Sequence, residues 1–290
     1  MSLKNKIDFA VVFAVKDANP NGDPLNGNRP RTTCEGLGEV SDVCIKRKIR
    51  NRLMEKGVPI FVQSDDNKLD DCSSLRSRAD AAKLPFNNPK KLQTEACKKW
   101  FDVRAFGQLF ALPSKKGNRA QGDAGEGAGE DKGVSIGIRG PVSVQSAFSM
   151  TPVSVTSTQI TKSVSAEDPK PGKSRGSDTM GMKHRVDQGV YVLFGSMNPQ
   201  LAVRTEFSDE DAATMKSVLP RLFENDASSA RPEGSMEVLK VIWWQHNCPS
   251  GQVSSAKVHR SLHVSPKEDM TVDITFDDIK GLKPEVIEGY

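Results

Sequence analysis

The residues best suited to bind a ligand lie in one short stretch, Asn19–Arg31, which reads NPNGDPLNGNRPR. Its prolines fix φ, and its glycines and asparagines readily adopt positive φ, so we expect a loop that holds one shape. The amides of Asn19 and Asn21 can hydrogen-bond to backbone or to a ligand, and Arg29 and Arg31 supply planar, permanently charged donors suited to phosphate. The alternative is a structural turn at the end of a strand, which the stretch taken alone favours.

A second candidate for phosphate binding follows directly, in a helix that we predict from Asp42 to Lys56. Ser41 is a favourable N-cap, and Ile45, Ile49 and Leu53 recur four residues apart, so they should face the core. Six basic residues and one acid follow Asp42 in this helix. Solvated faces usually mix both signs, so phosphate contact is as good an interpretation as a solvated face. The residues expected to contact phosphate are Lys46, Arg47 and Arg50.

A third basic segment interrupts a pair of predicted strands. Val134–Val144 alternates apolar residues with small or basic ones, among them Arg139, and Gly189–Gly195 is strongly apolar. The run between them, Thr156–Arg185, is polar and mainly basic. This pattern predicts a β-hairpin whose tip is expanded into a long basic arm. The basic residues of the arm include Lys162, Lys183, His184 and Arg185.

Motifs of common enzymes and metal sites are incomplete in this sequence. The tripeptide Gly172–Ser174 resembles the end of a P-loop, but Glu167 stands where that loop needs glycine. His259 and His263 have the spacing of a zinc protease, but Arg260 replaces the required glutamate. No serine-hydrolase elbow occurs, and the histidines show no recognisable pairing with cysteine or serine. We therefore predict no catalytic residue, no metal and no cofactor.

Composition indicates a soluble protein with a sizeable core. The chain has 290 residues, 36% hydrophobic content, 27% charged residues and a mean hydropathy of −0.49. The longest apolar run, Phe9–Val15, is too short to span a bilayer, and the N-terminus lacks the pattern of a secretory signal. Five scattered cysteines fit reduced thiols. We therefore expect a cytoplasmic protein without membrane attachment.

Charge is distributed unevenly along the chain. Residues 1–200 contain 31 Lys and Arg against 22 Asp and Glu, a net charge of +9. Residues 201–290 contain 10 against 15, a net charge of −5. The basic part predicts an anionic partner, and the asymmetry also favours head-to-tail packing of copies, basic face against acidic face.

The remaining elements must position these segments. Ile7–Val15 is apolar on both faces, which indicates a buried central strand. The other predictions are an insertion at 57–93, a helix at 94–112, a loop at 113–133, a helix at 208–223, a strand at 236–245 and weaker edge strands at 253–263 and 270–276.

Without its two insertions the chain runs strand, helix, strand, strand, helix, strand. This is the ferredoxin-like or RRM-type order, an α+β fold whose antiparallel sheet carries two helices on one face and leaves the other free for a ligand. The aromatic motif of ordinary RRM domains is absent, so RNA would be bound by charge and loops.

Several of these segments occur together, in the same order, in a known family. They are Asn19–Pro24 (NPNGDP), Arg29–Arg31 (RPR), Ser41–Arg52 (SDVCIKRKIRNR), Asp102–Phe110 (DVRAFGQLF) and the strand at Ser135–Ser146. In these segments the chain resembles the RNA-binding backbone subunits of type I CRISPR Cascade complexes, the Cas-seven (Cas7) family, and in particular its I-C or I-B branch.

The resemblance implies a hand-shaped subunit. A modified ferredoxin-like palm would comprise residues 1–56, 134–149 and 186–290, with a helical finger insertion at 57–133 and a long β-hairpin thumb at 150–185. Copies would polymerise along the guide crRNA, hold its backbone and displace a base at intervals, leaving the other bases to pair with target DNA in antiviral defence. The implied partners are the guide crRNA, neighbouring copies, a Cas-five-like subunit, the large subunit and target DNA.

The resemblance also assigns roles to the candidate residues. Met180, with Met182, would wedge beside the displaced base. The other predicted RNA-binding residues are Asn19, Asn21, Arg29, Arg31, Lys46, Arg47, Arg50, Arg139, Lys162, Lys183, His184 and Arg185.

Two alternatives to a structural RNA-binding subunit stay open. Related subunits of type III complexes cleave RNA with a metal-dependent aspartate in the loop after the first strand, and Asp23 is the candidate here. The other alternative is a solitary RRM-like regulator. The missing catalytic constellation favours a subunit that is not an enzyme.

Overall fold

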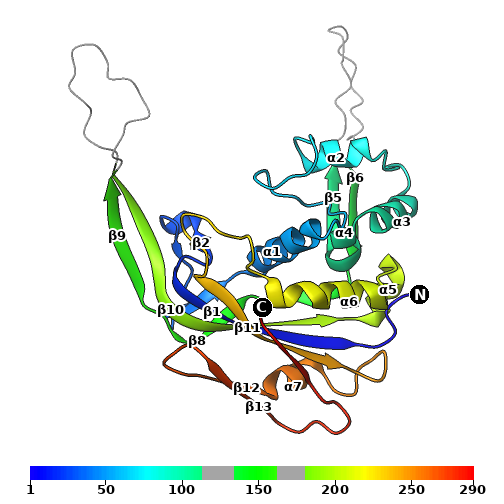
Figure 1. Cartoon of the computed structure of the whole chain (residues 1–290). Helices are drawn as coiled ribbons and strands as arrows, with labels where there is room; N and C mark the ends of the chain where they lie inside the picture. The colour runs from blue at the N-terminus through cyan, green and yellow to red at the C-terminus, as the bar shows by residue number, and fades with distance from the viewer. Residues whose placement is uncertain (113–133, 162–179) are drawn as a thin grey trace, which may run out of the picture.

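The computed structural model describes residues 1–112, 134–161 and 180–290 (Figure 1). The predicted loop at 113–133 and the part of the predicted arm that includes Lys162 lie outside the described residues. The strands are β1 (Ile7–Ala18), β2 (Gly22–Asp23), β3 (Arg29–Pro30), β4 (Leu37–Val40), β5 (Gly107–Leu112), β6 (Val134–Arg139), β7 (Val142–Val144), β8 (Ala147–Pro152), β9 (Val155–Thr161), β10 (Met180–Met197), β11 (Met236–Gln245), β12 (Leu262–Pro266), β13 (Val272–Phe276) and β14 (Glu285–Glu288). The α-helices are α1 (Asp42–Glu55), α2 (Leu75–Ala81), α3 (Pro89–Lys99), α4 (Phe101–Phe106), α5 (Pro199–Thr205), α6 (Asp209–Val218) and α7 (Ser255–Arg260), and the 3-10 helices are η1 (Pro24–Asn26) and η2 (Leu219–Arg221).

An eight-stranded sheet forms the centre of the molecule. Its main path runs β14-β11-β1-β10-β8-β4, and β7 and β9 also pair with β10. Each of these pairings is antiparallel. The central order β11-β1-β10-β8 places the last, first, third and second core strands side by side, which is the ferredoxin-like order. The predicted α+β class with a large antiparallel sheet is therefore confirmed.

One face of the sheet is covered by α1 and α6, as predicted (Figure 1). All residues from Ile7 to Val15 in β1 are buried, which confirms a central strand. Phe9 and Phe13 share one core cluster with Ile45 and Ile49 of α1, and all four side chains have 0% exposure. The spacing of apolar residues in α1 therefore places this helix on the sheet.

The opposite face of the sheet is covered too, which corrects the expectation of a free face. Val12 of β1 and Trp244 of β11 belong to a second core cluster with Val258 of α7 and Leu262 of β12. The predicted edge strand at 253–263 is wrong over most of its length, because Ser254 caps α7 there. Strands β12 and β13 pair with each other in a separate sheet beneath the main one (Figure 1).

The segment from residue 57 to Arg139 builds a unit with its own core. Phe61, Trp100 and Phe110 pack together with ring centroids 4.7 and 5.2 Å apart. The helix predicted at 94–112 is broken at Trp100, whose backbone is extended, into α3 and α4, and it is wrong beyond Phe106, where the chain turns into β5. Gly107 has φ 81°, and a Cβ there would lie 2.2 Å from the Ile138 carbonyl oxygen, so only glycine fits this reversal.

The predicted strand from 134 to 149 is divided into three. β6 pairs with β5 in a separate two-stranded sheet, whereas β7 and β8 pair with β10 in the main sheet. Gly140 follows β6 and leaves no room for a Cβ, which would lie 2.2 Å from the Ala105 carbonyl oxygen. None of the helices in the described ranges is long and apolar enough to cross a membrane.

Candidate nucleic-acid interface

The loop Asn19–Arg31 folds into a small hairpin of strands β2 and β3 closed by η1. Asp23 caps η1 by accepting a hydrogen bond from Leu25 N at 3.2 Å. Gly27 and Asn28 then adopt positive φ of 58° and 61°, as expected for these residue types. The side chain of Leu25 is 98% exposed at the outer end of the hairpin. The prediction of a loop with one defined shape therefore agrees with this geometry.

The two asparagines that were predicted to bind RNA hold the loop itself. Asn19 is buried; its backbone N–H donates to Ala230 O at 2.8 Å and its Nδ2 donates to Asn28 O at 2.7 Å. Asn21 Oδ1 accepts from both the N–H and the Oγ of Ser41, at 2.9 and 2.8 Å. Because Ser41 is the N-cap of α1, Asn21 fixes the start of that helix to the loop.

The two arginines of the loop lie at its surface. Arg31 Nη2 lies 3.3 Å from Asp23 Oδ1, with both side chains partly exposed. Arg29 Nη1 donates to Ser157 Oγ of β9 at 3.1 Å, so the loop touches the β9–β10 hairpin. Ser157 Oγ also lies 2.8 Å from Nδ1 of His184, which is 9% exposed. The structure therefore brings Arg29 and His184 together through one hydroxyl.

The cations of α1 are paired with carboxylates. Lys46 pairs with Asp42 at 2.9 Å, and Arg47 pairs with Asp66 at 2.8 Å. Arg50 Nε donates to Asp102 Oδ2 at 2.9 Å. Lys46 and Arg47 stay accessible, with 23% and 51% of their side chains exposed, but Arg50 is only 13% exposed. A phosphate on this helix would thus compete with ion pairs that the sequence did not reveal.

The remaining basic residues of α1 are part of the protein interior. Lys48 is 3% exposed and pairs with Asp226, which also accepts from Arg231 Nε at 3.0 Å. Burial lowers the pKa of Lys48, and the charge of Asp226 opposes this shift. Arg52 pairs with Glu55 within the helix. Both cations are buried and paired within the protein, so they offer little surface to a ligand.

Two charged residues that the sequence analysis did not single out anchor this region. Asp102, 1% exposed, accepts from Phe61 N at 2.7 Å and Val62 N at 3.0 Å in addition to Arg50. Arg104 forms two hydrogen bonds with Asp211 of α6, at 2.9 and 2.7 Å. For Asp102, the sequence offered one indication of a structural role: an acidic residue between Phe101 and Val103, in an otherwise apolar turn.

The β9–β10 hairpin carries the remaining predicted contacts. Met180 and Met182 are 65% and 54% exposed and share one face of β10 with His184. Lys183 and Arg185 point to the other face, where Arg185 pairs with Asp17 at 3.2 Å. Lys162 lies outside the described residues.

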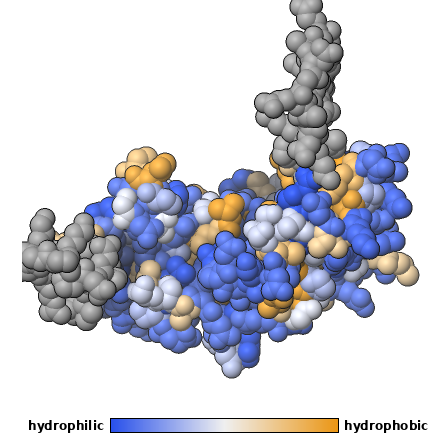
Figure 2. Space-filling view, turned by 90° about the horizontal axis from the view of Figure 1, so that it is seen from above, coloured by the Kyte–Doolittle hydropathy of each residue, from blue (hydrophilic) through white to orange (hydrophobic). Residues whose placement is uncertain are grey.

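Arg139 stands apart from these residues. It is exposed on β6 opposite Gly107, in the β5–β6 hairpin. This hairpin and the β9–β10 hairpin rise from different ends of the main sheet, on the side that carries α1 (Figure 1). Seen from above, the surface on that side is mostly hydrophilic and is interrupted by small hydrophobic patches (Figure 2). Such a surface suits a charged, extended ligand better than an apolar one.

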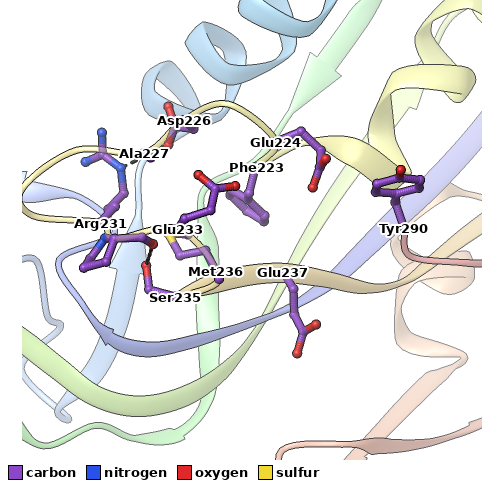
Figure 3. Close-up of a pocket in the computed structure, with 12 residues that line it drawn as sticks. Phe223, Glu224, Asp226, Ala227, Arg231, Glu233, Ser235, Met236, Glu237 and Tyr290 are labelled. Atoms are coloured by element: carbon purple, nitrogen blue, oxygen red, sulfur yellow. Dashed lines mark hydrogen bonds and ion pairs between the residues drawn. The ribbon is translucent and has the colours of Figure 1, made fainter.

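A cavity of about 250 Å³ near the end of η2 has the opposite character. It is lined by Glu224, Asp226, Glu233 and Glu237, and Arg231 is a basic residue of its wall (Figure 3). Four carboxylates repel a polyanion. We therefore do not assign phosphate binding to this cavity.

Asp23 is the candidate for metal-dependent chemistry. Its carboxylate accepts from Leu25 N and lies beside Arg31, so both of its contacts stabilise the loop. Within the three described ranges, no group of three His, Cys, Asp or Glu side chains is placed to hold a metal ion.

The family model, the related sequence and the solved structures that resemble this chain all carry CRISPR-related descriptions. A family model described as CRISPR-associated protein Cas7 matches residues 5–281. A CRISPR-associated protein Cas7 of Haloferax volcanii is 24% identical over 260 residues, which cover 83% of this chain and 71% of the relative. Similar solved structures include a chain of a CRISPR RNA-guided surveillance complex, pre-nicking (TM-score 0.46, 16% identity, 82% of this chain and 75% of that chain). Another is a chain of a CRISPR RNA-guided surveillance complex (TM-score 0.43, 16% identity, 82% and 68%).

Proposed function

The chain belongs to the CRISPR-associated Cas7 family, and from this premise we propose that it is the crRNA-binding backbone subunit of a type I Cascade surveillance complex. Copies polymerise along the guide RNA and present it for pairing with target DNA in antiviral defence. The observation that carries the proposal is the family match over residues 5–281, nearly the whole chain. We also propose the I-C or I-B branch, on the segments NPNGDP and SDVCIKRKIRNR.

The proposed hand has three parts. The palm is formed by residues 1–56, 140–149 and 186–290, the finger by 57–139 and the thumb by 150–185. Residues 134–139, expected in the palm, are counted with the finger because β6 pairs with β5. Support for the finger comes from the separate core around Phe61 and Trp100. Support for the thumb comes from the β9–β10 pairing, which extends from Val155↔Val186 to Thr161↔Met180.

RNA is held through its backbone by residues on the side of α1. Arg29, Arg31, Lys46, Arg47 and Lys183 are accessible cations of the loop, of α1 and of the thumb. Asn19 and Asn21 act by shaping the loop, and Met180 with Met182 lies beside the displaced base. The proposed contacts also include Arg139, Lys162, His184 and Arg185. Arg50, which was also expected to contact RNA, is assigned to the fold instead, because its partner is the buried Asp102.

The subunit acts together with partners and not as a nuclease. Its partners are the guide crRNA, neighbouring copies, a Cas-five-like subunit, the large subunit and target DNA. The complex acts in the cytoplasm. The charge difference between residues 1–200 and 201–290 supports head-to-tail contact between copies. The bonds of Asp23 to Leu25 and Arg31 support a structural role for this carboxylate.

Sedimentation of the purified chain with and without guide RNA tests the proposal. The expected result is a set of long oligomers that form only with RNA and grow with RNA length. A single copy bound to RNA of any length would instead identify a solitary regulator.

A cleavage assay tests the enzymatic alternative separately. The assembled complex is incubated with complementary RNA and magnesium, and Asp23→Ala serves as the comparison. We expect intact RNA in both samples. Regularly spaced cleavage that disappears in Asp23→Ala would overturn the non-enzymatic assignment.

A further inference from the structure

The ion pair between Arg47 and Asp66 has the geometry of an arginine bound to an oxyanion. Arg47 Nη2 donates to both carboxylate oxygens of Asp66, at 3.1 Å to Oδ1 and 2.8 Å to Oδ2. A guanidinium binds the oxygens of phosphate with the same donors and at similar distances. Asp66 therefore occupies Arg47 in the way a backbone phosphate would.

The segment that carries Asp66 is shaped to hold an acid over α1. Asn67 N donates to Ser64 O at 3.0 Å, which forms a turn with Asp66 near its tip. Gln63 closes the neck of this turn, since its Oε1 accepts from Leu69 N and its Nε2 donates to Ile60 O, both at 2.8 Å. The turn thus brings a carboxylate to the helix from outside it.

This pair differs from the buried ion pairs of α1 because either residue can exchange its partner for another ion. Asp66 and Arg47 are 70% and 51% exposed, so either can meet water or another ion without unfolding. By contrast, the partner of Arg50 is the buried Asp102, and Lys48 is itself buried. Exposed ion pairs are weak enough to be displaced by a more highly charged anion.

We propose that Asp66 is an intramolecular substitute for phosphate, which pairs with Arg47 in the free protein and is expelled when the RNA backbone binds. The inference rests on the proposed function and adds a regulatory contact to it. Free subunits keep this cation neutralised, and only a polyanion that also contacts neighbouring cations displaces the carboxylate. Asp66 therefore lowers the affinity for any anion that needs Arg47 by the same modest factor, which a long RNA with many other contacts tolerates better than a weakly bound short anion.

Removal of the Asp66 charge should raise RNA affinity. For Asp66→Asn we expect an increase of about two- to fivefold over wild type, the range that an exposed ion pair can supply. The measurement is fluorescence anisotropy with a labelled oligouridine, using the full chain. Asp65→Asn is the matched control. It removes the same charge from the neighbouring residue, and the exposed side chain of Asp65, unlike that of Asp66, has no ion pair among the described residues.

A double variant shows whether Asp66 acts through Arg47. In an Arg47→Gln background we expect Asp66→Asn and wild-type Asp66 to bind the oligouridine equally. The proposal is overturned if Asp66→Asn binds no tighter than Asp65→Asn, or if its gain persists without Arg47. If wild type and all variants fail to bind RNA at all, the proposed function itself falls, and the two failures are thus distinguishable.

Discussion

The side chain of Asn21 joins the loop Asn19–Arg31 to the first helix. Its one oxygen accepts two hydrogen bonds from Ser41, so the shape of the loop and the start of α1 are set together. Asn19 has a similar role toward Asn28 and Ala230. These amides were predicted to meet RNA, but the residues that they contact belong to the protein.

Asn21→Ala should destabilise the fold by about 1 kcal/mol, because the N-cap of α1 loses its support. Urea unfolding measures this difference. Asn26→Ala, at an exposed position in the same loop, should leave the stability within about 0.5 kcal/mol of wild type. An equal loss in both variants would mean that the Asn21–Ser41 contact contributes nothing specific.

Asp8 is a buried carboxylate that should make stability depend on pH. Burial favours a raised pKa for Asp8, but the hydrogen bond with His246, the nearby polar groups of His259 and Ser255 and the charge of Lys6 bring its pKa well below the usual range. The His246 Nε2 to Asp8 Oδ2 distance is 2.9 Å. Because the folded pKa lies below the unfolded value of about 3.9, Asp8 stabilises the fold above that pH and the contribution is lost as pH falls further.

Asp8→Asn should therefore flatten the acid side of the stability profile. We expect the free energy of unfolding of wild type to fall more steeply than that of the variant below about pH 4. Urea unfolding at a series of pH values gives both curves. Asp278→Asn, at an exposed position, should keep the wild-type slope, and parallel curves for Asp8→Asn would contradict this role of Asp8.

At the scale of elements, the sequence predicted those whose local signals agree with their packing. β1, α1, α6 and β11 were placed correctly because apolar spacing and caps such as Ser41 and Ser208 act within a few residues. The helix predicted at 94–112 failed because the reversal at Gly107 depends on a close approach to Ile138. Contacts between distant segments leave no periodic pattern in the sequence.

The same limit applies to the candidate site. The excess of positive charge on α1 was visible in the sequence, but its neutralisation was not. The partners of Arg47, Arg50 and Lys48 lie 19, 52 and 178 residues away. The sequence alone therefore could not show which of these cations stay accessible to a ligand; the three-dimensional fold was needed for that.

Separate substitutions in α1 should distinguish ligand contacts from structural ones. Lys46→Gln and Arg47→Gln should weaken RNA binding uniformly across sequences, and each lost phosphate contact should reduce the salt slope by about 0.7. Arg50→Gln should instead cost about 3 kcal/mol of stability, because Asp102 then stays buried without its cation. Binding titrations at several salt concentrations and urea unfolding measure the two effects. A sequence-selective loss in the first pair would contradict backbone contact.

At the scale of the whole molecule, both faces of the main sheet are covered, each by different elements. α1 and α6 cover one face, while α7, β12 and β13 cover the other, so the sheet presents little free surface of its own. The residues proposed to contact RNA lie on the loop, on α1 and on the two hairpins that rise beside it (Figure 1). The proposed RNA contacts therefore come from the elements that surround the sheet and not from the sheet itself.

β10 has a mechanical consequence for an assembly of such subunits. Its 18 residues run without a break from the outer part of the hairpin to the centre of the sheet, a length of about 60 Å. One end pairs with β9 and the other with β1. The hairpin and the centre of the sheet therefore share one continuous hydrogen-bonded strand, so a load on the outer end of the hairpin would act on the same strand that pairs with β1 in the core.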